Sequence, residues 1–508
     1  MYKRQLFILG AMFFALPWSA QQKRKQMKNP NVVIIYVDDL GYGDLSSYGA
    51  TKISTPNIDA LTQKGIRFTN AHSTAATCTP SRYSMMTGKY PFRQSGTNIL
   101  PGDAKLIISL EDFTLPKVFK QAGYKTAIIG KWHLGLGSTV EKNWNAELKP
   151  GPLEVGFDYS FIFPATADRV PTVFVENHNV VNVQAEDSIT VSYSHKVGNE
   201  PTGSENPELL KMKASPNHGH NNTIVNGIGR IGWMSGGTAA RWTDEELSFT
   251  FIDKVKSFIA ENKEKPFFLF YNATEPHVPR MPATMFKGKS GLGYRGDAIL
   301  QLDHSVGEIT QQLKNLGLLE NTIVVFTSDN GPVLDDGYQD GAVEMLNGHR
   351  PSAGLRGGKY SAFEAGSRMP FIVSWPQQIK SAQTSEALVG QLDLLSSFAK
   401  MLNVTVPAKQ AYDSQNLIQT FIGKSNSGRE YIVKSSGTFS IIKGKYKYIK
   451  PSKGEKMNEL TQIELGNSIE DQLYDLSVDP YEINNIAKEN PKIVQELKAT
   501  LEAELSSK

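Results

Sequence analysis

Short apolar runs alternate with amphipathic stretches from about residue 31 onward. The runs are rich in β-branched and aromatic residues, which is typical of buried strands, and the stretches repeat apolar residues every three or four positions, which predicts helices. The predicted strands are residues 32–37, 126–129, 267–271, 322–327 and 371–374, and the predicted helices are residues 115–122, 247–261, 298–316 and 388–402. Strands separated by helices imply βαβ units, so we expect an α/β fold with a mostly parallel sheet sandwiched by helices.

Two segments depart from this alternation. Residues 176–237 have little helical periodicity and many Asn, Gly, Ser and His residues, which predicts a long excursion that lines one rim of the sheet. After about residue 423 the pattern changes to short antiparallel strands, at residues 431–433, 439–443 and 446–449, followed by a final helix at residues 491–505. We therefore expect a large domain over residues 31–423 and a smaller α+β subdomain over residues 424–508 that contains an antiparallel sheet.

The first twenty residues have the features of a secretory signal peptide. Lys3 and Arg4 precede an apolar run at residues 6–16, which ends in the small residues Ser19 and Ala20. The run is about half of the ~20 residues that span a bilayer, and no later stretch is typical of a transmembrane helix. These residues, 1–20, predict an exported protein, periplasmic or secreted, without a membrane span.

Composition narrows the range of partners. The chain has 54 lysines and arginines against 51 aspartates and glutamates, so its net charge is only +3. This balance argues against broad electrostatic binding to nucleic acid or to membrane surfaces. The single cysteine, Cys78, cannot form an intramolecular disulfide, although an exported protein could use one.

Polar side chains follow four of the predicted strands. They are Asp38-Asp39, Lys131-Trp132-His133, Glu275-Pro276-His277 and Asp329-Asn330. Ligands of open α/β sheets bind beyond the carboxyl ends of the strands, so we expect these residues to meet at one edge. Each segment alone could be a solvated turn or a helix cap.

Four of these side chains could hold a metal ion: Asp38, Asp39, Asp329 and Asn330. They offer hard oxygen donors, which suit calcium or magnesium better than zinc. Calcium is favoured because it accepts six to eight irregularly placed oxygens, whereas magnesium demands an octahedron. Adjacent aspartates after a buried strand need a cation or a basic partner.

Cys78 precedes a predicted helix. Pro80 can occupy the first turn of that helix, which places Cys78 just outside its start, where free backbone N–H groups favour an anion. Arg82 lies one turn further and offers a planar fork to a tetrahedral oxyanion. The alternative is an ordinary helix start with a surface arginine.

The segment Cys78-Thr79-Pro80-Ser81-Arg82 matches the Cys-x-Pro-x-Arg maturation motif of type I sulfatases, and the chain resembles that family from about residue 31 to residue 370. Six further motifs are similar to the family and stand in its order: Asp38-Asp39-Leu40-Gly41-Tyr42-Gly43-Asp44, Thr55-Pro56-Asn57-Ile58-Asp59, Gly130-Lys131-Trp132-His133-Leu134-Gly135, Pro276-His277, Ser328-Asp329-Asn330-Gly331 and Gly357-Gly358-Lys359. The resemblance implies an alkaline-phosphatase-like fold and the hydrolysis of sulfuric esters.

The resemblance also implies roles for individual residues. Cys78 would be oxidised to formylglycine by a formylglycine-generating or sulfatase-maturing enzyme, and would then act as the nucleophile beside one calcium ion, with magnesium the less favoured metal. Asp38, Asp39, Asp329 and Asn330 would hold the ion together with residue 78. The resemblance assigns sulfate binding to Arg82, Lys131 and Lys359, and proton transfer to His133 and His277.

The substrate implied is a sulfated carbohydrate of a host or algal glycan. Residues 217–237 resemble an insertion of bacterial carbohydrate sulfatases, and four residues are candidates to bind sugar hydroxyls or carboxylates: Thr166, Asp168, Arg169 and Arg280. We expect an exo-acting O-sulfatase that acts on a sulfated hexose or N-acetylhexosamine.

Two other functions remain open at this point. The first is a phosphate or phosphonate monoester hydrolase of the same superfamily, since both esters are tetrahedral anions. Two-zinc relatives, however, commonly show Asp-His-Gly where this chain has Asp329-Asn330-Gly331. The second is an inactive homologue that only binds sulfated glycans.

Overall fold

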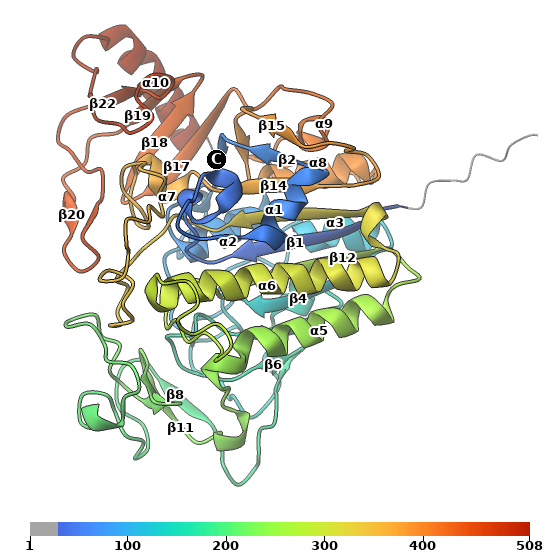
Figure 1. The fold of residues 1–508 in the computed structure, drawn as a ribbon, viewed down its shortest axis with the longest axis vertical. Helices are drawn as coiled ribbons and strands as arrows, with labels where there is room; N and C mark the ends of the chain where they lie inside the picture. The colour runs from blue at the N-terminus through green and yellow to red at the C-terminus, as the bar shows by residue number, and fades with distance from the viewer. Residues whose placement is uncertain (1–28, 508) are drawn as a thin grey trace, which may run out of the picture.

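A ten-stranded sheet forms the centre of the molecule, which was studied as a computed structural model that describes residues 29–507 (Figure 1). The predicted signal peptide, residues 1–20, lies outside the described residues. From one edge to the other the strands are β15 (Gln383–Ser385), β2 (Gly65–Phe68), β14 (Phe371–Ser374), β13 (Thr322–Ser328), β1 (Asn31–Val37), β12 (Phe267–Asn272), β4 (Lys125–Lys131), β5 (Tyr159–Phe163), β6 (Val175–Glu176) and β7 (Asn179–Val180). The five central strands, β13 to β5 in this order, are parallel. Antiparallel strands join them on both sides, so the sheet as a whole is mixed.

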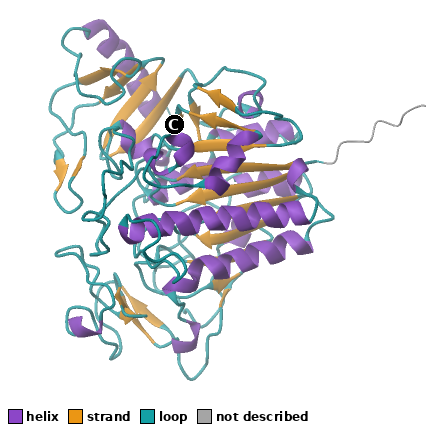
Figure 2. Ribbon diagram, viewed as in Figure 1, coloured by secondary structure: helices purple, strands orange, loops and turns teal. Residues whose placement is uncertain are grey.

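Helices cover both faces of the sheet, because alternate residues of the buried strands point to opposite sides (Figure 2). On one face Val33, Ile35 and Val37 pack in a cluster with α5 (Leu247–Glu261) and α6 (Gly293–Asn315). On the other face Val32, Ile34 and Tyr36 pack in a cluster with α2 (Cys78–Thr87), α3 (Leu115–Gln121) and α8 (Asp393–Met401). The expected α/β sandwich is therefore confirmed. Across residues 29–507, no helix combines the length and the apolar character that crossing a bilayer would require.

Most predicted elements are present with small shifts. The helix predicted at residues 388–402 begins only at Asp393, because Val389–Gly390 forms strand β16, which pairs with β3 (Ala71–His72). Helix α6 begins at Gly293, five residues before the predicted start at residue 298. Strands β2 and β5 were not predicted, although β5 lies directly beside β4.

The excursion at residues 176–237 is built from short paired strands. β8 (Thr190–Ser192) pairs with β11 (Trp233–Ser235), and β9 (Ile224–Val225) pairs with β10 (Ile228–Gly229). Arg230 is fully buried and binds Asp244 through both terminal nitrogens, at 2.9 and 2.6 Å. This ion pair anchors the excursion to the segment that leads into α5. Figure 1 shows β8 and β11 in green at the lower left.

The C-terminal part forms a second, smaller sheet at the upper left of Figure 1. Its antiparallel strands are β17 (Tyr431–Ser436), β18 (Thr438–Lys443), β19 (Tyr446–Ile449) and β22 (Gln472–Asp475), and α10 (Pro491–Ser506) packs against them. A hairpin of β20 (Met457–Asn458) and β21 (Ile463–Glu464) projects from this sheet. The expected antiparallel C-terminal unit is confirmed, while its boundary after residue 423 stays a prediction.

Buried charges connect the two sheets. Glu364, at the start of α7 (Glu364–Ser367), accepts one hydrogen bond from Lys434 at 2.8 Å, and its carboxylate lies 3.0 Å from Lys447 Nζ. Lys447 also lies 2.7 Å from Glu482, and none of these four side chains is more than 2% exposed. Removing one partner of such a buried set leaves an uncompensated charge, which costs about 3–5 kcal/mol. The network therefore fixes α7, and with it the loop at residues 357–363, against the C-terminal sheet.

Candidate active site

The loops that follow the central parallel strands converge at one edge of the sheet. Asp38 and Asp39 follow β1, Lys131 ends β4, His277 follows β12, and Asp329 and Asn330 follow β13. All are buried, as are Cys78 and Arg82 on α2 and Lys359 on the loop before α7. The fold thus brings together the residues that the sequence predicted for the metal and the chemistry.

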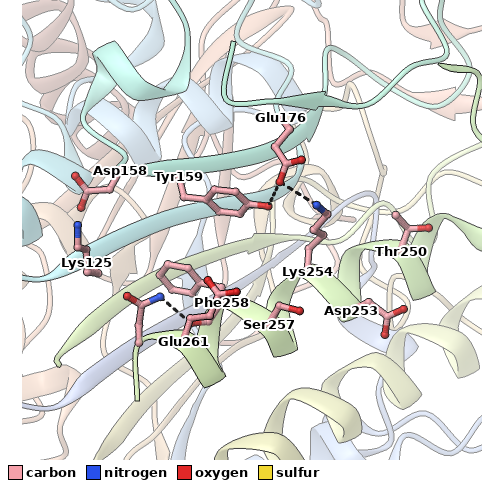
Figure 3. A pocket seen from close by; sticks show the side chains of 11 residues that line it. Lys125, Asp158, Tyr159, Glu176, Thr250, Asp253, Lys254, Ser257, Phe258 and Glu261 are labelled. Atoms are coloured by element: carbon pink, nitrogen blue, oxygen red, sulfur yellow. Dashed lines mark hydrogen bonds and ion pairs between the residues drawn. The ribbon is translucent and has the colours of Figure 1, made fainter. Parts of the chain in front are cut away.

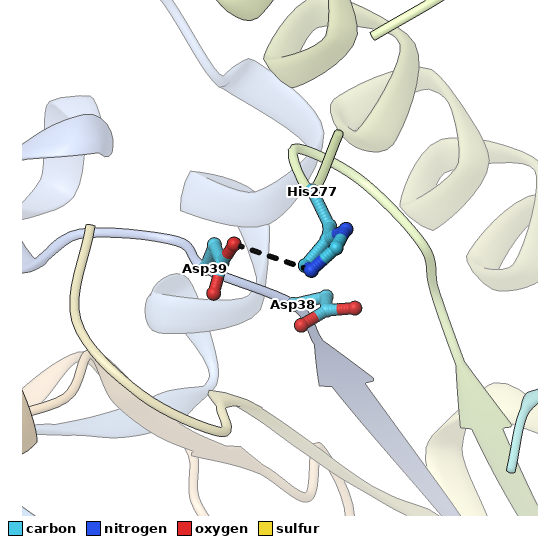
Figure 4. Close-up of side chains that lie close together, drawn as sticks. All are labelled: Asp38, Asp39 and His277. Carbon is cyan, nitrogen blue, oxygen red and sulfur yellow. Dashed lines mark ion pairs between the residues drawn. The ribbon is translucent and has the colours of Figure 1, made fainter. Parts of the chain in front are cut away.

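Asp38 and Asp39 lie beside His277 (Figure 4). One ligand atom from each of the three residues lies within 4.8 Å of the others, and His277 Nε2 is 3.7 Å from Asp39 Oδ2. Asp329 joins the cluster from β13, where its Oδ1 accepts a hydrogen bond from the Asp39 backbone N–H at 3.3 Å. Three carboxylates therefore share one buried site.

Each of the three carboxylates has its own buried cation. Lys131 Nζ lies 2.5 Å from Asp38 Oδ2, and Lys359 Nζ lies 2.9 Å from Asp39 Oδ2. Arg82 donates two hydrogen bonds to Asp329 Oδ2, at 3.1 and 2.9 Å. The alternative of a surface arginine at position 82 is therefore wrong, and Lys131 and Lys359 are buried as well.

The pKa values of two of the carboxylates, Asp38 and Asp329, are shifted in opposite directions. Burial opposes ionisation of Asp38, but the charges of Lys131, His277 and Arg82 outweigh it and hold the pKa of Asp38 well below its usual range. Burial, together with the charge of Asp38, raises the pKa of Asp329 to about 7. The raised pKa of Asp329 means that burial and the charge of Asp38 oppose its ionisation, and a cation bound beside it would relieve both effects.

The donor atoms fit a hard metal ion. Asp38 Oδ1 and Asn330 Oδ1 are buried and accept no hydrogen bond within the described part of the chain. Asn330 uses its Nδ2 to donate to Asp39 Oδ1 at 2.7 Å, so its oxygen stays free. Buried oxygens without partners are costly, and a cation would satisfy both. The set of carboxylate and amide oxygens is one that calcium accepts.

Cys78 is the first residue of α2, with Thr77 in the N-cap position, rather than lying just outside the helix as predicted. The residue is 1% exposed, and burial raises the pKa of its thiol although Lys131 and Lys359 oppose this. It lines a cavity of about 190 Å³ together with Asp168, Arg169, His277 and Lys359. One small cavity is thus lined by the candidate nucleophile Cys78, by the cations Arg169 and Lys359, and by His277.

The two predicted proton-transfer histidines have defined tautomers when neutral. His277 Nδ1 lies 2.6 Å from the carbonyl of Val278, and His133 Nε2 lies 2.9 Å from the carbonyl of Leu100. A carbonyl only accepts, so these nitrogens carry the proton and leave His277 Nε2 and His133 Nδ1 for other partners. Burial lowers the pKa of both imidazoles, and for His133 the nearby Lys131 adds to the effect.

Three non-glycine residues of the site have left-handed backbone conformations. The φ angles are 61° at Asp39, 54° at His133 and 74° at Tyr360. Such conformations cost of the order of 1–3 kcal/mol each and concentrate at functional sites. Tyr360 is held in this conformation by the hydrogen bond from its backbone N–H to Ala76 O, at 2.8 Å, two residues before Cys78.

The predicted sugar-binding residues divide into two groups. Asp168 and Arg169 line the cavity, and Thr166 supports Arg169 by accepting a hydrogen bond at 2.6 Å. Arg280 does not line it: the side chain is 1% exposed and is paired with Asp340 at 2.7 Å. The prediction that Arg280 grips the substrate is not supported by this position, because its guanidinium is consumed by Asp340 and by backbone carbonyls.

Asp336 and His220 are among the cavity residues for which the sequence predicted no role. Asp336 lies 2.7 Å from Lys359 Nζ, and it also accepts a hydrogen bond from the Tyr360 hydroxyl at 3.0 Å. The adjacent acidic pair Asp335-Asp336, shortly after Asn330, was the available signal. His220, which belongs to the excursion at residues 176–237, lines the cavity and lies 3.0 Å from Asp168 Oδ2.

A second hollow, of about 640 Å³, lies between α5 and strands β4, β5 and β6 (Figure 3). Glu176 accepts a hydrogen bond from the Tyr159 hydroxyl at 2.6 Å and pairs with Lys254 at 2.9 Å. These three polar side chains are thus engaged with one another, and none of the described residues that line the Cys78 cavity lines this hollow. The chemistry of the molecule is concentrated at Cys78 instead.

Comparisons with known proteins agree with this geometry. The family model described as Sulfatase matches residues 30–404, and a model described as N-sulphoglucosamine sulphohydrolase, C-terminal, matches residues 358–508. The chain is 53% identical over 478 residues to the N-acetylgalactosamine-6-O-sulfatase of Bacteroides thetaiotaomicron, covering 94% of this chain and 93% of that protein. It is 30% identical to human Arylsulfatase A, over 92% of this chain and 86% of that protein.

Solved structures show the same fold. A Bacteroides thetaiotaomicron structure, reported under the metabolism of multiple glycosaminoglycans, superposes with a TM-score of 0.93 at 52% identity and covers 94% of this chain and all of that one. The phosphonate monoester hydrolase of Agrobacterium radiobacter superposes with a TM-score of 0.56 at 15% identity, over 94% of this chain and 95% of that one, which shows a shared fold alone.

We predict that calcium raises the melting temperature of the protein more than magnesium does. A ligand that binds only the native state at about 100 times its Kd stabilises it by about 2.7 kcal/mol. Thermal unfolding with calcium, magnesium or a chelator measures the shift, and Asn330→Ala should reduce it by removing one orphaned oxygen.

Asp335→Asn is the matched control, because this carboxylate binds Ser215 Oγ at 2.8 Å outside the cluster and should leave the calcium shift intact. An equal calcium shift in wild type and Asn330→Ala would contradict the assignment of the metal site.

Proposed function

The chain belongs to the sulfatase family and hydrolyses sulfate esters, and from this premise we propose that it is an exo-acting carbohydrate O-sulfatase. We propose that it removes the 6-sulfate of a terminal N-acetylgalactosamine, using calcium and a formylglycine at position 78. The similarity over 94% of the chain to the Bacteroides thetaiotaomicron enzyme supports this substrate. The observation that carries the proposal is the position of Cys78, buried at a helix start inside a cavity that Lys359 and His277 also line.

Calcium would be held by Asp38, Asp39, Asp329 and Asn330, together with residue 78. When bound, it would neutralise the buried carboxylates and lower the pKa of an oxygen nucleophile. The orphaned oxygens of Asp38 and Asn330 support this assignment.

Formylglycine at position 78 would supply a hydrated aldehyde, which has one hydroxyl to attack sulfur and a second that permits release of sulfate. The partner for this change is a formylglycine-generating or sulfatase-maturing enzyme. Because Cys78 is 1% exposed in the folded chain, such an enzyme would have to act before folding is complete. The proposed export to the periplasm or the exterior would follow maturation.

The cations at the site would hold the sulfate group. Lys131, Lys359 and Arg82 are fixed by ion pairs to the carboxylate cluster, so their positions are set before the substrate arrives. Preorganised cations stabilise the charge that develops on the sulfuryl oxygens in the transition state.

His277 would protonate the leaving sugar oxygen. His277 lines the cavity, its Nδ1 is held by the Val278 carbonyl, and its Nε2, 3.7 Å from Asp39 Oδ2, is the nitrogen left for the substrate. Burial lowers the pKa of His277, and an entering sulfate ester would add negative charge that favours the protonated imidazole. His133 would assist the return of residue 78 to its aldehyde form.

The sugar would be held on the opposite wall. Asp168 is placed between Arg169, at 2.9 Å, and His220, at 3.0 Å, which presents charged and polar groups to sugar hydroxyls. His218 Nε2 lies 3.2 Å from the Leu460 carbonyl, so the excursion and the C-terminal hairpin meet beside the cavity. A cavity of about 190 Å³ has room for a single sugar beside Cys78, which supports exo action on a terminal residue.

A phosphate or phosphonate monoester hydrolase is the main alternative, because that chemistry occurs on the same fold. Asn330 lies at the proposed metal site. Among the described residues, the candidate metal-binding group of Asp38, Asp39 and His277 contains no cysteine and no second histidine. This set favours one hard cation over two zinc ions. An inactive glycan-binding homologue is disfavoured because every predicted catalytic side chain is present.

We predict that the matured enzyme releases sulfate from 6-sulfated N-acetylgalactosamine. The 4-sulfated isomer and the 6-phosphate should react at least about 100-fold more slowly, because a site built around one polar arrangement discriminates by this order. Rates of sulfate and phosphate release with calcium present measure the difference. Faster hydrolysis of the phosphate would favour the alternative function.

We also predict that the loss of rate in His277→Ala depends on the leaving group of the substrate. Loss of a general acid should slow sugar-sulfate hydrolysis by about 10²–10⁴-fold but nitrophenyl sulfate by less than about tenfold, because nitrophenol leaves without protonation. The comparison of kcat/KM for the two substrates measures this. His195→Ala, an exposed histidine of the excursion, is the control and should change neither rate. Equal losses on both substrates in His277→Ala would rule out the general-acid role.

A further inference from the structure

The cavity at Cys78 is too small for more than the reacting end of a glycan. Its volume is about 190 Å³, whereas ligand sites usually span about 300–1,000 Å³. A sulfate group and one sugar ring would fill it. If the substrate is the end of a longer chain, the next sugar must lie in a neighbouring space.

Such a space opens directly beside the cavity. A cleft of about 630 Å³ lies between the start of α2, the short 3-10 helix η3 (Pro91–Arg93) and the turn that joins β17 to β18. Ile99, Tyr360 and Asn458 line both the cavity and the cleft, so the two spaces adjoin at these residues. A chain whose end reaches Cys78 could pass Tyr360 into the cleft.

The two spaces differ in chemistry. The cavity is lined by charged groups, among them Asp168, Arg169, Asp336 and Lys359. Of the described residues that line the cleft, none is Asp, Glu, Lys, Arg or His; they are aromatic, aliphatic, or carry hydroxyl or amide groups. The described lining of the cleft therefore offers no cation to a carboxylate or a second sulfate.

Aromatic rings form one side of the cleft. Phe92 and Phe439 are half-buried, and their ring centroids are 5.5 Å apart in an edge-to-face arrangement. The ring of Phe92 is also stacked on the ring of Tyr90, which is 1% exposed, so a buried aromatic neighbour supports Phe92. Rigid aromatic faces beside hydroxyl and amide groups suit the apolar face and polar edge of a sugar ring.

We propose that this cleft, with Phe92 and Phe439 as its platform, binds the sugar next to the sulfated one and prefers an uncharged residue there. This inference rests on the proposed carbohydrate sulfatase function and names the second half of its substrate. It assigns a binding role to the C-terminal sheet, which contributes Phe439 and the segment before it.

The test is a calorimetric binding measurement on Cys78→Ala protein loaded with calcium, which cannot turn over. The ligands are 6-sulfated N-acetylgalactosamine and two disaccharides that carry this sugar at the non-reducing end, joined either to galactose or to glucuronate. The galactose disaccharide should bind about tenfold more tightly than the monosaccharide, the order expected for one aromatic contact, and more tightly than the glucuronate disaccharide.

Adding Phe439→Leu, which keeps an apolar side chain but loses the aromatic face, should remove the gain for the galactose disaccharide and leave monosaccharide binding unchanged. Tyr481→Leu is the matched control, because Tyr481 is a 46% exposed aromatic outside the cleft. Equal affinity for monosaccharide and galactose disaccharide, or an equal loss on both with Phe439→Leu, would overturn the inference while leaving the proposed function in place. Equal binding of the two disaccharides would overturn the preference for an uncharged neighbour. Failure of all three ligands to bind would contradict the proposed function as well.

Discussion

Three carboxylates buried at the ends of two neighbouring parallel strands impose a charge constraint on this fold. Asp38, Asp39 and Asp329 are all shielded from water, and each is paired with a different buried cation from another segment of the chain. Burying a charge without a partner costs several kcal/mol, so the strands, α2 and the loop at residue 359 can reach their positions only together. The same constraint leaves oxygens of Asp38 and Asn330 without hydrogen-bond partners, which is where a metal ion would bind.

The chemistry follows from this arrangement. Two of the cations that neutralise the carboxylates, Lys131 and Lys359, also act to lower the pKa of the Cys78 thiol at the start of α2. In the proposed function the same preorganised charges would hold the tetrahedral sulfate group. The loop that carries Lys359 is held from the other side by Glu364 and the C-terminal lysines Lys434 and Lys447. The small C-terminal sheet is thus tied to the catalytic edge by buried charge as well as by the hairpin that reaches the cavity. The strained backbone at Asp39, His133 and Tyr360 is maintained by this surrounding structure.

Much of the site could be predicted from local sequence. The apolar runs located four of the five central parallel strands, and the polar residues after them were correctly expected to meet, because parallel strands share one carboxyl edge. The residues that local pattern could not place are those whose role depends on distant partners. In the sequence Arg280 is an ordinary loop arginine, and only the fold shows that its guanidinium forms an ion pair with Asp340. Asp336 was missed because its partner Lys359 lies 23 residues away, and β16 was read as helix because its pairing with β3 joins residues more than 300 positions apart.

The measurement that tests the account most directly is mass spectrometry of the peptide containing residue 78, combined with the turnover number of the same preparation. The account predicts that sulfatase activity rises in proportion to the fraction of chains that carry an aldehyde at position 78, and that Cys78→Ala has none. Full activity in a preparation whose residue 78 is entirely an intact thiol would contradict it.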